Sequence, residues 1–268
     1  MIKQKTSSMK LKPRYNPIKC GLYLLLLLAL PLFSLADTNG SLFEKGNTAY
    51  AKAQYQQAVQ TYQQILGDGY QSAAIYFNLG NAYYKLGDIP SALLYYEKAH
   101  KLSPGDEDIN FNIQLVNLKT ADKLEQAPDF FVTQWWDGFI LLLSANTLSA
   151  LSILFIIVGF LILILYLFTK SASVKRSSFY TGIVAIFLGL IFIFIANRQE
   201  YYFSSHHQAI IFGSSVTAKS TPDDNAKPLF VVHEGTKVNV IQKNDVWIEI
   251  ELPNGNAGWI AAGDAKDI

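Results

Sequence analysis

The pattern of hydrophobic positions divides the chain into three apolar runs and two segments of mixed polarity. The runs cover Leu22–Leu30, Leu148–Phe168 and Phe179–Ala196, and the last two contain no charged residue. At a rise of about 1.5 Å per residue, each of these two is long enough to cross a bilayer as a helix. A core helix of a soluble protein rarely stays apolar on every side for this length. The pattern therefore predicts membrane helices at 148–168 and 179–197, joined by a loop at 169–178.

The first apolar run is shorter and has the order of a secretory signal. A tail with six Lys/Arg residues and no acid precedes it, and the small-x-small step Ser34-Leu35-Ala36 follows it. We expect residues 1–36 to be a signal peptide that is cleaved near Ala36; an uncleaved anchor is the alternative. The single cysteine, Cys20, lies before this run, so no disulfide framework is expected.

The distribution of charge predicts the orientation. The link at 169–178 holds Lys170, Lys175 and Arg176 and no acid, whereas 37–134 holds seven Lys against eleven acids and 206–268 holds five against eight. Positive charge beside apolar segments is retained in the cytoplasm. We therefore expect a multi-pass protein of a bacterial inner membrane with both folded segments in the periplasm.

The first folded segment repeats itself at an offset of 34 residues. Five residues recur with the same identity: Gly46, Asn47, Tyr50, Ala58 and Tyr62 return as Gly80, Asn81, Tyr84, Ala92 and Tyr96. The period and the pattern resemble the tetratricopeptide repeat, a stack of antiparallel helix pairs. A third copy begins at Pro104, but its second helix is not visible. We therefore predict an all-α solenoid at 37–127 that ends in a capping helix at 106–124.

Aromatic and asparagine side chains recur on the first helix of each pair, which lines the concave face of such a stack. Asparagine can donate to and accept from a peptide backbone, and an aromatic ring offers apolar contact. The candidate partner-binding residues are Phe43, Asn47, Tyr50, Phe77, Asn78, Asn81, Tyr84, Phe111 and Asn112. The alternative is that Phe77 and Phe111 belong to the core between repeats.

The region around the apolar runs carries further membrane signals. Trp135 and Trp136 suit the headgroup level, so 128–147 is expected to be an interfacial segment. Gly182, Ala185 and Gly189 lie near one face of the second run, and small residues let helices approach closely. The two runs are therefore expected to pack as a hairpin. Neither contains an ionisable residue, which argues against an ion or proton pathway.

The last segment, 206–268, changes to the alternation typical of strands. The run from Gly235 to Ile260 resembles a bacterial SH3-like domain, a small all-β barrel. Trp247 is expected in its core, because a domain of this size needs large side chains to bury enough area. Trp259, which follows Gly258 in a tight turn, is a candidate ligand-binding residue.

Candidate catalytic chemistry is sparse. His206 and His207 are adjacent, but no third metal ligand is close in sequence, and no phosphate-binding loop, zinc-protease motif or nucleophile elbow is present. We therefore expect no catalytic residue, cofactor or metal, and no enzymatic activity.

The order of signal, repeats, two spans and SH3-like domain resembles the BatE-type members of the Bat (Bacteroides aerotolerance) family. The resemblance covers nearly the whole chain, most tellingly at 106–124 running into FFVTQWW and at LFVVHEGTKV near Leu229. It implies an association with membrane proteins that carry von Willebrand A domains and with a MoxR-type ATPase, and a link to oxygen or oxidative-stress tolerance.

These features favour a membrane-anchored scaffold or adaptor with two separate interaction modules. The repeats would bind one partner protein, and the SH3-like domain a second protein, a peptide or peptidoglycan; no feature points to nucleic acid. An envelope stress sensor or cell-wall-binding signal transducer is the alternative, but the cytoplasmic parts are small for an output domain. A hydrolase would need a catalytic constellation that the sequence does not contain.

Overall fold

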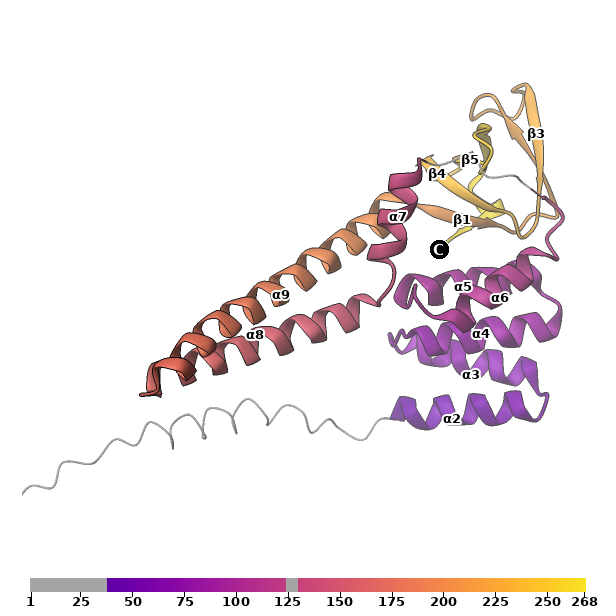
Figure 1. Ribbon diagram of the computed structural model, residues 1–268. Helices are drawn as coiled ribbons and strands as arrows, with labels where there is room; N and C mark the ends of the chain where they lie inside the picture. Colours follow the sequence, from indigo (N-terminus) through magenta and orange to yellow (C-terminus); the bar gives the residue numbers. More distant parts are fainter. Residues whose placement is uncertain (1–37, 124–129) are drawn as a thin grey trace, which may run out of the picture. The chain divides into compact units, whose positions relative to one another are not determined.

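Five antiparallel helices form the first part of the chain in the computed structural model, which describes residues 38–123 and 130–268 (Figure 1). The expected signal peptide lies outside the described residues. The helices are α2 (Thr38–Ala51), α3 (Tyr55–Gly67), α4 (Ala73–Leu86), α5 (Ile89–Leu102) and α6 (Glu107–Asn117). The pairs α2–α3 and α4–α5 are the two repeats that the 34-residue offset predicts. Helix α6 follows as the first helix of a third unit.

Close helix crossings explain the glycines of the repeat. A Cβ atom on Gly80 would lie 2.7 Å from Cδ1 of Tyr96, and one on Gly46 would lie 2.5 Å from Cε1 of Tyr62. Each glycine thus lets the tyrosine of the second helix lie flat against the first helix, and both tyrosines are buried. Gly87, which ends α4 with φ +83°, makes the tight turn into α5.

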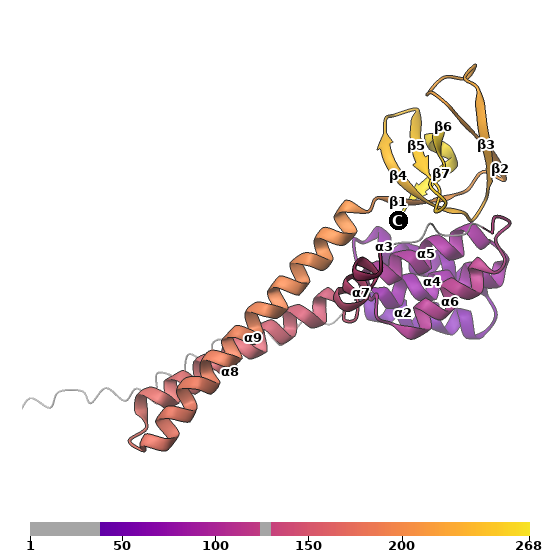
Figure 2. The same ribbon diagram turned by 45° about the horizontal axis from the view of Figure 1, so that its top comes forward.

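Two long apolar helices, α8 (Ala145–Phe168) and α9 (Ala172–Ser205), pack side by side as a hairpin, and each is long and apolar enough to cross a membrane (Figure 2). Gly159 of α8 and Gly182 and Gly189 of α9 are buried at their contact, as the small-residue pattern predicts. The bend is shorter than the expected loop: helix α9 already begins at Ala172, and it continues to Ser205. No glycine or proline interrupts the chain over either extension, so the helix is not broken there.

The last part of the chain is an antiparallel sheet in the order β3-β2-β6-β5-β4-β1-β7. Its strands are β1 (Gln208–Ile211), β2 (Ser215–Lys219), β3 (Pro228–His233), β4 (Lys237–Lys243), β5 (Trp247–Glu251), β6 (Ala257–Ala261) and β7 (Ala265–Asp267), and the short 3₁₀ turn η2 (Ala262–Asp264) precedes β7. The sheet folds around an aliphatic core that includes Ile248, Ile250 and Ile260. The structure therefore contains a small C-terminal β domain.

Strand β1 joins the β domain to the helical stack. Ala209 and Ile211 face the core of the sheet, and Ile210, which points to the opposite face, packs with Leu93 and Val116 of α5 and α6. The sheet thus packs on α5 and on the C-terminal part of α6. The two folded segments are therefore packed together through β1. Helix α6 lies within the range 106–124 expected for the capping helix and ends at Asn117.

Ionic and hydrogen-bonded contacts surround this apolar seam. The carboxylate of Asp122 accepts hydrogen bonds from the backbone N of His233 (2.8 Å) and the hydroxyl of Thr236 (2.7 Å), and it lies 2.8 Å from Nδ1 of His233. Lys237 pairs with Glu97 at 2.8 Å, and the Glu97 side chain is only 5% exposed. Burial works to raise the pKa of Asp122, but the hydrogen bonds from His233 and Thr236 outweigh it and lower the pKa.

Replacing Gly80 by alanine should destabilise the stack by about 1–3 kcal/mol, because the new methyl group overlaps the Tyr96 ring. Gly67→Ala is the matched control, since a Cβ at Gly67 meets no atom within 4 Å. Urea unfolding of the full chain in detergent, monitored by circular dichroism, measures the free energy of unfolding of both variants. Equal stabilities for the two variants would contradict the proposed crossing.

Asp122→Asn should lower the free energy of unfolding at neutral pH by about 1–3 kcal/mol, because an amide NH2 would then face hydrogen-bond donors. The lowered pKa means that the carboxylate stabilises the fold at pH values above its unfolded value of about 3.9 and loses this effect as the pH falls through the folded value. The difference in Tm between the unmodified chain and Asp122→Asn should therefore narrow below pH ~4. Asp68→Asn, which changes an exposed carboxylate, is the control. A Tm difference between the unmodified chain and Asp122→Asn that stays constant with pH would count against the hydrogen bonds of the Asp122 carboxylate.

Candidate protein-binding groove

A ladder of asparagines connects the first helices of successive repeats. Oδ1 of Asn47 accepts hydrogen bonds from the hydroxyl of Tyr62 (2.8 Å) and from Nδ2 of Asn78 (3.0 Å). The same arrangement recurs 34 residues later, where Oδ1 of Asn81 accepts from Tyr96 (2.6 Å) and from Asn112 (3.2 Å). The structure therefore brings together the four predicted asparagines, and each rung ties one repeat to the next.

Buried phenols hold this ladder in place. Burial raises the pKa of Tyr62 to about 12 and also raises the pKa of Tyr96. Both hydroxyls therefore remain protonated at physiological pH and keep donating to the asparagine oxygens. The orientation of each asparagine is fixed by a partner on the neighbouring helix.

The other polar atom of each asparagine faces solvent. Among the residues that the structure describes, Nδ2 of Asn47 and Asn81 and Oδ1 of Asn78 and Asn112 make no hydrogen bond. In the same residues no buried side-chain nitrogen or oxygen lacks a partner, so these four atoms must reach water. Donors and acceptors thus alternate along the ladder. An extended peptide backbone presents the complementary groups.

The predicted aromatic residues fall into two classes. The rings of Phe43 and Tyr62 lie 6.0 Å apart and those of Phe77 and Tyr96 lie 5.7 Å apart, so both phenylalanines pack between helices. Phe111, at the next equivalent position, is 64% exposed. Within 38–123 no second helix follows α6 to supply a covering tyrosine. Phe77 is therefore part of the packing, whereas Phe111 offers an open apolar surface.

Tyr50 and Tyr84 occupy equivalent, half-buried positions further along the first helices. Tyr50 meets Tyr55 edge to face, with ring centroids 5.3 Å apart. The ammonium group of Lys119 lies 4.4 Å above the ring of Tyr84. This contact places a positive charge beside the last rung of the ladder, which the sequence analysis did not identify. Lys119 lies one repeat offset after Lys85, and this recurrence in the sequence could have indicated Lys119 as a candidate residue.

The two tryptophans of the β domain lie on the outer face of the sheet, away from the asparagine ladder. Trp247 was expected in the core, but it alternates with the buried Ile248 and is only half-buried. Trp259 pairs across the sheet with Glu249 and Lys219, and the Lys219 ammonium lies 5.3 Å from the Trp247 ring. Both rings are therefore accessible on one face, and the core is aliphatic instead.

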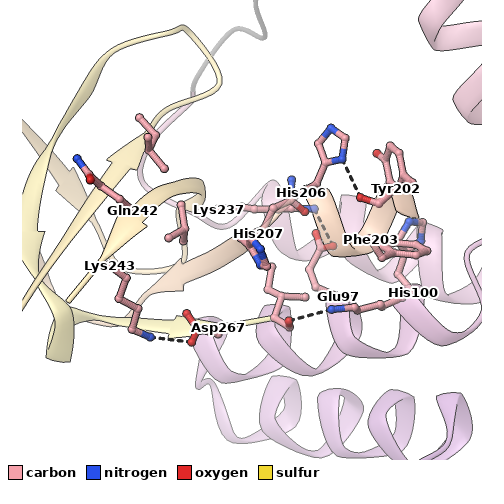
Figure 3. A pocket seen from close by; sticks show the side chains of 15 residues that line it. Glu97, His100, Tyr202, Phe203, His206, His207, Lys237, Gln242, Lys243 and Asp267 are labelled. Atoms are coloured by element: carbon pink, nitrogen blue, oxygen red, sulfur yellow. Dashed lines mark hydrogen bonds and ion pairs between the residues drawn. The ribbon is translucent and has the colours of Figure 1, made fainter. Parts of the chain in front are cut away.

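A hollow of about 390 Å³ lies where α5, the end of α9 and the sheet meet (Figure 3). His100, His206 and His207 line it, and Glu97–Lys237 and Lys243–Asp267 form ion pairs across it. Nδ1 of His100 is bonded to Asn110 at 2.8 Å, and burial lowers the pKa of His100. No cluster of three metal-binding side chains occurs in the described part of the chain. The Glu97–Lys237 pair joins α5 to β4, whereas Lys243–Asp267 joins two strands of the sheet.

Comparisons with known proteins support the repeats. Residues 40–104 match the family model of the tetratricopeptide repeat, which is less than half of the chain. A comparison with curated protein sequences finds no match. A solved structure of a TPR repeats protein from Bacteroides fragilis is similar at 17% identity over 70% of this chain and 84% of that chain, with a TM-score of 0.30. A TM-score this low carries no argument. The family match shows that the helical stack contains tetratricopeptide repeats, which are characteristic of scaffolds for protein–protein interaction.

Proposed function

We propose that this chain is a membrane-anchored adaptor that holds an extended segment of a partner protein along the asparagine ladder. The observation that carries the proposal is the alternation of solvent-facing amide donors and acceptors across two repeats. A bound backbone would satisfy these groups without disturbing the bonds that fix them. The exposed ring of Phe111 would supply apolar contact next to the last rung.

The hairpin supports the anchoring role. Leu148 near the start of α8 packs with Ile195 of α9, and α9 continues in the same direction to Ser205, so both helices leave the hairpin on the side opposite the bend. If the hairpin crosses a membrane, the repeats and the β domain therefore lie on the same side. Lys170, Lys175 and Arg176 at the bend favour the cytoplasm for the opposite side and the periplasm of a bacterial inner membrane for both domains.

The resemblance to the Bat family suggests the identity of the partners. We propose that they are membrane proteins with von Willebrand A domains and that the complex serves oxygen or oxidative-stress tolerance. The β domain, as an SH3-like module, would bind a second protein, a peptide or cell-wall material through the face that carries Trp247 and Trp259. A role as a signal transducer is less well supported, since only Thr169–Ser171 separate the two helices of the hairpin at the bend.

Phe111→Ala should weaken the affinity for the proposed von Willebrand A-domain partner by about tenfold or more, equivalent to ~1.4 kcal/mol. The ring is exposed, so its loss should leave Tm unchanged. Leu229→Ala is the matched control, because Leu229 is also an exposed apolar residue but lies on β3. The measurement is a titration of the full chain in mild detergent against the purified partner. Equal affinities for both variants would remove the groove from the proposal.

A further inference from the structure

Helix α7 (Phe131–Ile140) separates its polar and apolar residues cleanly. At 100° per residue, Phe131, Trp135, Phe139, Val132 and Trp136 follow one another around one half of the helix. Thr133, Asp137, Gln134 and Gly138 occupy the other half. The apolar half is open: eight large apolar side chains are exposed between residues 130 and 143, namely Phe130, Phe131, Val132, Trp135, Trp136, Phe139, Leu142 and Leu143.

We propose that α7 lies flat in the lipid–water interface on the side of the membrane that carries the folded domains. A helix with this distribution leaves its apolar half in water unless another phase covers it. Tryptophan rings suit the interface because one edge is apolar and the indole N–H reaches polar groups. The proposal rests on the part of the proposed function that places the hairpin across a membrane, and not on the groove.

The position of α7 is set by a buried amide at the end of the hairpin. Gln199 of α9 is only 1% exposed, and its Nε2 donates hydrogen bonds to the carbonyl oxygens of Ile140 and Leu143, both at 2.8 Å. These carbonyls belong to the last turn of α7 and its link to α8, where a helix leaves such groups unpaired. Ile140 itself packs with Leu148 and Ile195. Gln199 therefore fixes the end of α7 to the outer end of the hairpin.

This attachment point coincides with the end of the apolar surface of the hairpin. Ile195 is the last large aliphatic residue of α9, and the exposed polar residues Asn197, Arg198 and Glu200 follow it. A polar run at the end of an apolar helix marks the level at which a membrane helix leaves the hydrocarbon. Helix α7 is therefore held at the depth where amphipathic helices bind.

The segment around α7 carries almost no charge, which bears on the kind of surface it can bind. Residues 130–143 contain no lysine or arginine and one acid, Asp137, so attraction to anionic headgroups cannot hold this segment. Its association should depend on burial of the rings and be insensitive to salt and to lipid charge. The proposed covering phase is thus a lipid interface whatever the charge of its headgroups, and a helix of another protein is the alternative that the experiment must distinguish.

The chain offers its own fluorescent probes and controls, because two of its four tryptophans lie in α7 and two in the β domain. A variant with Trp247→Phe and Trp259→Phe reports on α7 alone, and one with Trp135→Phe and Trp136→Phe reports on the sheet alone. Each full-length variant is reconstituted in phosphatidylcholine vesicles that carry a nitroxide either near the headgroup or near the end of the acyl chain. The shallow label should quench the α7 pair at least about twofold more than the deep label, and neither should quench the sheet pair.

Three results would overturn the proposal, and they differ in what else they affect. If aqueous acrylamide quenches both pairs equally while the chain resists carbonate extraction, α7 is in water but the hairpin still crosses the membrane. If the α7 pair is protected from acrylamide and from both lipid labels, a protein covers it. If carbonate strips the chain from the vesicles, the membrane anchor of the proposed function fails as well.

Gln199→Leu tests the positioning role, since leucine fills the site but cannot donate to the two carbonyls. We expect α7 to remain in the lipid, and the ratio of shallow to deep quenching to change by about twofold because the depth is no longer fixed. Gln114→Leu, at an exposed position of α6, makes the same exchange away from α7 and Gln199 and serves as the matched variant. An unchanged quenching ratio in Gln199→Leu would show that Gln199 does not set the depth.

Discussion

The burial of strand β1 on both faces is the constraint on which the arrangement of the folded domains depends. Ala209 and Ile211 enter the core of the sheet while Ile210 enters the core of the helical stack, so the strand belongs to two cores at once. Neither core is complete without it. The hydrogen bonds of Asp122 and the ion pair of Glu97 with Lys237 lie around this apolar centre and fix the orientation of the sheet on the stack, because directional bonds to charged groups tolerate little rotation.

This contact fixes the distance between the repeats and the hairpin, which matters for the adaptor role that we propose. Only His206 and His207 separate the end of α9 from β1, and β1 is itself fixed to α5 and α6. A segment bound along the asparagine ladder would therefore be held at a set distance from the end of the hairpin. The closeness of Gly105 to the backbone of Leu142 restricts the stack further, since even a methyl group at that position would overlap the carbonyl.

Features that repeat or alternate along the chain could be predicted from the sequence, and features made by single contacts across the fold could not. The 34-residue offset revealed the repeats, and the small residues of α9 indicated the hairpin. Asp122 and Gln199 show no pattern, because their partners are donors or carbonyls 56 to 114 residues away. The unbroken apolar run Ala209–Phe212 is typical of a strand buried on both faces, and no prediction used it. The prediction of Trp247 in the core was wrong, because its alternation with the buried Ile248 places Trp247 on the outer face.

The asparagine ladder shows why repetition alone cannot distinguish packing from recognition. One atom of each amide satisfies a buried phenol or the next asparagine, and the other faces water, so a single residue serves both purposes. Replacing Asn47 or Asn81 would leave the Tyr62 or Tyr96 hydroxyl without its acceptor and weaken the stack as well as any ligand contact. Phe111 has no such double role, because within residues 38–123 no second helix follows α6 to cover it. The end of the solenoid is therefore the place where partner binding can be separated from folding.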